Sequence, residues 1–99
     1  MDAGTMYAAR VIHELERMEE AVLDDDSPYV DWKCAVLYGA ALDEIDRTMD
    51  DLREGIRAGK IGHGLLRLTQ RRLLSIADLL NRVGDRKRAL QAARELEEE

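Results

Sequence analysis

The sequence predicts an all-α protein, an antiparallel bundle of three long helices followed by a short fourth helix. Apolar residues recur at steps of three and four through most of the chain, which is the spacing of one helix face. Proline occurs once, at Pro28, whereas a β-rich domain needs turn residues every few positions. Aromatic residues make up 4% of the chain and Phe is absent, so we expect an aliphatic core. The 99 residues are expected to form a single domain, 1–99.

The first helix is predicted over residues 5–23. Its apolar stripe consists of Ala8, Val11, Ile12, Leu15, Met18 and Val22. Three aspartates, at positions 24–26, interrupt this pattern. Ser27 followed by Pro28 has the sequence of an N-cap and a first helical residue, so we expect the second helix to begin at residue 28.

The second helix, predicted over residues 28–56, has the most regular pattern of the chain. Its heptad stripe consists of Ala35, Tyr38, Leu42, Ile45, Met49, Leu52 and Ile56. Residues 32–42 are apolar on the other sides as well, which indicates that this part of the helix is covered on more than one side. Cys34 lies in this region and is expected to be a small buried hydrophobic residue rather than a nucleophile.

The third helix is predicted over residues 64–83 and the fourth over residues 85–96. Four glycines between positions 55 and 64 predict a chain reversal before the third helix. Its apolar stripe consists of Leu66, Thr69, Leu73, Ile76, Leu80 and Val83. Gly84 is expected to end this helix, and Asp85 to cap the fourth. Short connections favour antiparallel neighbours.

Charge is distributed unevenly along the chain. Residues 1–54 hold fifteen acidic and five basic residues, whereas residues 55–94 hold two acidic and ten basic ones. Either the two halves are neighbours in the bundle or across a dimer, or the basic half binds an anionic partner. The longest apolar run, 34–42, is nine residues, and the N-terminus lacks the basic flank of a signal peptide. We therefore expect a cytoplasmic protein that does not cross a membrane.

The favoured function is that of a small non-enzymatic interaction protein, such as a regulator, adaptor or inhibitor, with no cofactor. The surplus of apolar side chains in residues 32–42 predicts self-association, as a homodimer, through Trp32, Leu37 and Tyr38. A macromolecular partner, expected to be a protein, would contact the basic half through Arg67, Arg71, Arg82, Arg86 and Arg88. An alternative is that the basic half, 57–94, binds nucleic acid, with residues 72–96 laid out as a helix-turn-helix.

A second alternative is enzymatic and rests on acidic residues that share helix faces. The predicted metal ligands of this alternative are Glu16 and Glu19 on the first helix and Asp43 and Asp46 on the second. Their spacing resembles the Glu-x-x-Glu and Glu-x-x-Asp motifs of the all-helical MazG-like nucleotide pyrophosphohydrolases, with Asp43 in place of a Glu. The resemblance implies Mg²⁺-dependent hydrolysis of a nucleotide. Residues 42–46 also look like part of the helical chorismate mutases, although Gly39 stands where that family has a catalytic arginine.

Overall fold

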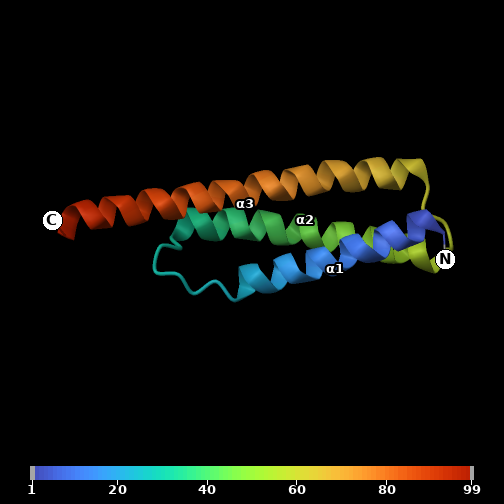
Figure 1. Cartoon of the computed structure of the whole chain (residues 1–99), viewed down its shortest axis with the longest axis horizontal. Helices are drawn as coiled ribbons and strands as arrows, with labels where there is room; N and C mark the ends of the chain where they lie inside the picture. The colour runs from blue at the N-terminus through green and yellow to red at the C-terminus, as the bar shows by residue number, and fades with distance from the viewer. Residues whose placement is uncertain (1, 99) are drawn as a thin grey trace.

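A computed structural model describes residues 2–98 and confirms the all-α class, with three helices and no strand in this range. The helices are α1 (Ala3–Leu23), α2 (Trp32–Arg57) and α3 (His63–Glu98). Consecutive helices run in opposite directions, and α1 and α3 lie on either side of α2 (Figure 1). The molecule measures 59 × 21 × 19 Å. Its length follows from α3, whose 36 residues extend about 54 Å at a rise of 1.5 Å per residue.

The three helices share one aliphatic core, which consists of Ala8, Val11, Ile12, Leu15, Ile45, Met49, Leu52 and Ile76. All of these residues belong to the stripes that the periodicity predicts. Thr48 and Thr69 are also buried, and their hydroxyls donate to the carbonyl oxygens of Glu44 and Leu65 four residues earlier. Cys34 is buried, as expected. None of the described helices combines the length and the apolar content needed to span a bilayer.

The prediction that the second helix begins at residue 28 is wrong. Its N-cap is Asp31, whose carboxylate accepts a hydrogen bond from the Cys34 amide at 3.1 Å. The Ser27 hydroxyl instead accepts from the Tyr29 amide at 3.2 Å, two residues on, and so closes a local turn. Short polar side chains make such turns in competition with helix capping. Pro28 therefore lies in the loop between α1 and α2.

The prediction of a separate fourth helix is also wrong, because α3 continues through Gly84 to Glu98. Gly59, with φ +73°, is the one residue in 2–98 with a positive φ, so Gly84 does not adopt the left-handed conformation of a helix end. Contacts on both sides of Gly84 explain this. Val83 is buried, and Arg86 is paired with Asp31 at 2.6 Å. Asp85 pairs with Arg88 within α3 instead of capping a new helix.

Gly84→Ala is expected to stabilise the protein by about 0.5–1 kcal/mol, because alanine favours the helix interior over glycine by that amount. The added Cβ would meet the flexible Arg88 guanidinium, 3.4 Å away at the nearest atom. Gly59→Ala is the control of opposite sign, expected to cost about 1 kcal/mol because φ is left-handed there. Urea unfolding of both variants measures the two effects. A similar loss of stability in both would mean that the helix ends at Gly84 in solution.

Candidate functional site

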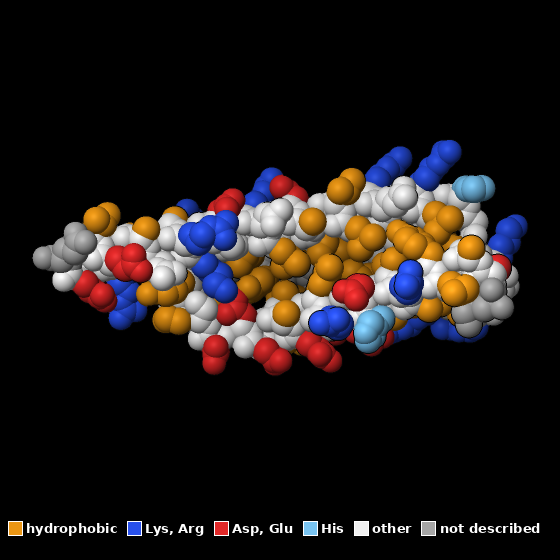
Figure 2. Space-filling model, in the orientation of Figure 1, with side chains coloured by type: hydrophobic (Ala, Val, Ile, Leu, Met, Phe, Trp, Pro, Cys, Tyr) orange, Lys and Arg blue, Asp and Glu red, His pale blue; other side chains and the backbone are white. Residues whose placement is uncertain are grey.

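An apolar groove runs between α1 and α3, and we call it the α1–α3 groove. It consists of three hollows that share walls: Tyr7 lines the first two, and Met18 and Leu80 line the second and third. The central hollow has a volume of about 450 Å³ and is also lined by Leu73 and Ala77. Figure 2 shows hydrophobic side chains gathered in a strip between the two helices. The groove is therefore continuous and mainly apolar.

The groove exists because both outer helices pack on α2. Leu15 of α1, Ile45 of α2 and Ile76 of α3 are almost completely buried in the shared core. Met18, Leu73 and Leu80 are only partly buried, on the side where α1 and α3 face each other. The facing sides of α1 and α3 are thus left partly uncovered where α2 does not reach, and the groove lies between them.

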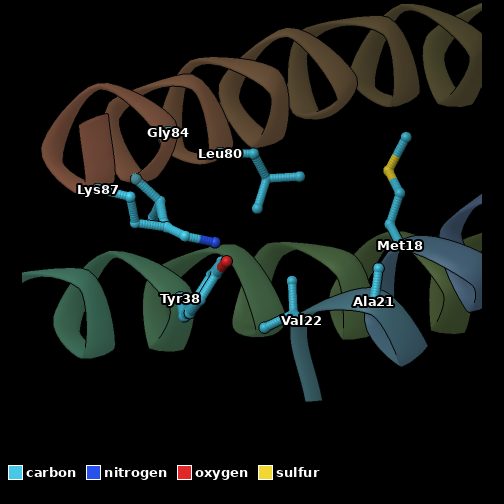
Figure 3. A pocket seen from close by; sticks show the side chains of 8 residues that line it. Met18, Ala21, Val22, Tyr38, Leu80, Gly84 and Lys87 are labelled. Carbon is cyan, nitrogen blue, oxygen red and sulfur yellow. The ribbon is translucent and has the colours of Figure 1, made fainter. Parts of the chain in front are cut away.

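A charged cluster lies where the groove meets the loop between α1 and α2. In Figure 3 the side chains of Tyr38 from α2 and Lys87 from α3 point toward each other. Both donate hydrogen bonds to the same oxygen of Asp25, Lys87 from Nζ at 2.7 Å and Tyr38 from its hydroxyl. These donors, Lys87 first, lower the pKa of Asp25 to about 2. Burial, and then the Asp25 carboxylate, raises the pKa of Tyr38, so its hydroxyl keeps the donating role.

Ion pairs connect the basic half of the chain to the acidic half. Arg86 donates to Asp31 from Nη2 at 2.6 Å and from Nε at 3.0 Å, and this pairing lowers the pKa of Asp31 to about 2. Arg72 pairs with Asp51 of α2 at 2.5 Å, and Lys87 with Asp25 as described. Neighbouring positions of the two halves in the fold thus account for part of the charge asymmetry.

All five arginines predicted as partner contacts lie on α3, but they differ in their exposure and in their ion-pair partners. Arg86 forms an ion pair with Asp31, at the end of the loop before α2. Arg82 and Arg88 are exposed and pair with Asp78 and Asp85 of the same helix, at 3.1 and 2.5 Å. Arg67 and Arg71 are exposed, and no ion pair joins them to another residue in 2–98. These side chains therefore do not form one uniform basic surface.

The residues predicted for self-association are also divided. Trp32 is 70% exposed at the start of α2, with the Lys33 Nζ 5.6 Å from its ring centroid. Val36, one turn further on, is 64% exposed. Leu37 and Tyr38 are half-buried, and Tyr38 belongs to the Asp25 cluster. Trp32 therefore has an exposed apolar neighbour that the prediction did not include.

Of the four carboxylates in the enzymatic alternative, the structure brings two into contact. The hydrogen bond between the side chains of Glu19 and Asp46 raises the pKa of Glu19. Glu16 pairs with Arg53 at 3.2 Å, and Asp43 is exposed. Within residues 2–98, no group of three or more His, Cys, Asp or Glu side chains is placed to hold a metal ion.

Comparison of the chain with models of known protein families, with curated proteins and with solved structures finds no match. The site must therefore be interpreted from its own residues. Sequence reasoning missed the α1–α3 groove, although Leu66, Leu73 and Leu80 recur at intervals of seven. The periodicity alone predicts that these three leucines lie in the closed interior of a bundle.

Tyr38→Phe is expected to reduce stability at pH 7 by about 1.5 kcal/mol, because it removes a hydrogen bond to a charged acceptor. Asp25 has a folded pKa of about 2, below its ordinary value of 3.8, so its pairing contributes fully above pH 4 and is lost as the pH falls toward 2. The cost of the substitution should therefore shrink over that range. Urea unfolding between pH 7 and 2 measures it, with Tyr29→Phe as the control. A cost that does not change with pH would contradict the pairing with Asp25.

Glu19→Gln is expected to raise the midpoint of thermal unfolding at pH 7, because it removes the repulsion between Glu19 and Asp46 and leaves a hydrogen-bond donor. The folded pKa of Glu19 is raised, so the native pair loses stability as the pH rises through that pKa. The advantage of the variant should therefore disappear near pH 4. Glu20→Gln, at an exposed neighbouring position, is the control. If MgCl₂ stabilises the native chain and not the variant, these carboxylates bind the metal and this account of them fails.

Proposed function

We propose that this chain is a non-enzymatic helical interaction module that binds one apolar helix of a protein partner in the α1–α3 groove. The observation that carries the proposal is the continuous apolar groove between the facing sides of α1 and α3. The groove is lined from Ala3 to Val22 on α1, a span of about 28 Å at 1.5 Å per residue. A helix of about five turns fits this length. An added helix between α1 and α3 would complete an antiparallel four-helix bundle.

The chemistry of the walls suits recognition of an amphipathic helix. Such a helix presents apolar side chains at positions i, i+3 or i+4, and i+7, and buries them in an apolar groove. Partly buried Met18, Leu73 and Leu80 would be covered on docking, and Ala77 leaves room for a larger side chain of the partner. Arg10 and Glu14 also line the central hollow, so charged residues beside the ligand stripe would fix its direction.

The nucleic-acid alternative has less support. Binding to phosphates depends on basic side chains that are free to neutralise them. Arg72, Arg86 and Lys87 are partly buried in ion pairs with acidic residues of α2 and its preceding loop. The exposed Arg82 and Arg88 each lie beside an acidic residue of α3, which reduces the positive potential there.

A designed peptide tests the proposal. The probe is a fluorescein-labelled amphipathic helix of about five turns with leucines at heptad spacing, and its anisotropy is followed on titration with dilute protein. Ala77→Glu places a charge in the central hollow and is expected to weaken binding tenfold or more. Ser75→Glu adds the same charge at an exposed position on the other side of α3 and should leave binding unchanged. Absence of binding to the native chain, or equal binding to both variants, would contradict the proposal.

A further inference from the structure

The C-terminal end of α3 extends beyond the other two helices (Figure 1). Lys87, paired with Asp25, is the last residue of α3 that forms an ion pair with the rest of the molecule. Every residue in 91–98 is exposed, and Leu96 is 71% exposed. We call residues 87–98 the tip. Because the Leu96 side chain is exposed, its burial by a contact outside the chain's own core would stabilise the tip.

The tip has the chemistry of a groove ligand. Ala89, Ala92, Ala93 and Leu96 share one side of this helix, and Leu90, on another side, is half-buried. Its last residues are acidic, with Glu95, Glu97 and Glu98 within the described range. The tip is thus an amphipathic helix that ends in negative charge. It points away from the groove of its own chain, so it can reach such a groove only in another copy.

One end of the α1–α3 groove matches these properties. The hollow at this end is lined by Ala3, Tyr7 and Leu66. Arg10 lies one turn further along α1 and lines the next hollow. The exposed Lys60 and Arg67 are at the same end of the molecule, near the start of α3. If an amphipathic helix with an acidic end binds here, its apolar side would contact Tyr7 and Leu66. Its acidic end would then lie near the positive charge of Arg10.

The two ends of the molecule are also complementary to each other. The loop after α1 exposes Asp24 and Asp26, and in Figure 2 acidic side chains gather toward the tip end whereas basic ones dominate the other end. Contact between two equal ends would bring like charges together. Contact between opposite ends brings the acidic loop of one copy to the basic end of the next, which is favourable.

We infer that the tip of a second copy of this chain binds at the Tyr7–Leu66 end of the groove. The tip is about 18 Å long at 1.5 Å per residue, so it covers part of the groove. The inference rests on the proposed function, because it names the helix that the groove binds. Leu96 would be buried beside Tyr7, and the glutamates of the tip would lie near Arg10. The interface joins two different surfaces, so each copy offers a free tip and a free groove, and copies associate head to tail.

Light scattering coupled to size exclusion tests the inference on the full chain. The native protein should form oligomers that grow with concentration and shrink at high salt, because the charged contacts are exposed. Deletion of residues 89–99 removes most of the tip and keeps the Lys87 and Arg86 pairs, and Tyr7→Glu charges the groove. Each variant alone should be monomeric. An equimolar mixture should give a 1:1 complex that grows no further, since it has one intact tip and one intact groove.

Matched controls separate docking from folding. Leu96→Glu should abolish association, whereas Gln91→Glu, on another side of the tip, should not. Ala9→Glu, exposed on the other side of α1, is the control for Tyr7→Glu. A native chain that stays monomeric at high micromolar concentration, oligomers that survive either defect, or a mixture that stays monomeric would overturn the inference. If the designed peptide still binds the groove in any of these cases, the proposed function stands and only the identity of its ligand is wrong.

Discussion

The packing of both outer helices on α2 is the interaction on which the rest of this structure depends. Ile45 and Leu52 are fully buried between α1 and α3, which contribute Leu15 and Ile76 to the same core. The buried aliphatic core lies at this contact, so its apolar side chains provide the main favourable free energy of packing. Because α2 fills the space on one side only, the facing sides of α1 and α3 are left with a groove between them. The docking surface is thus a consequence of how the core is built.

Electrostatic contacts hold the end of the groove in place. Asp25 and Asp31 lie in or next to the loop between α1 and α2, and each accepts from a basic residue of α3. These contacts tie the loop to the middle of α3 and keep the helix continuous where Gly84 would favour an end. They also neutralise part of the basic half, so the free positive charge is concentrated near the start of α3. The same ion pairs therefore contribute both to the continuity of α3 into the tip and to the uneven distribution of free charge between the two ends of the molecule.

The sequence predicts much of the fold, because steps of three and four mark the buried side of each helix regardless of its neighbours. It fails where a local choice depends on tertiary contacts. Ser27 has the sequence of an N-cap but closes a turn, and Gly84 has that of a helix end but is held within α3 by Val83 and Arg86. The groove was missed for a related reason: the width of an apolar stripe shows how much of a helix is covered, and not which element covers it. Leu73 and Leu80 therefore read as core in the sequence but line an open surface.

The most direct test of this account is the reactivity of a thiol in the groove in dilute protein. Ala77→Cys places the thiol in the central hollow, and the native Cys34, which is buried, serves as the protected reference in the same molecule. If the groove is open, the introduced thiol reacts with a maleimide at nearly the rate of the unfolded chain, while Cys34 reacts far more slowly. Equal protection of the two thiols would show that α1 and α3 close on each other in solution, and the groove would not exist.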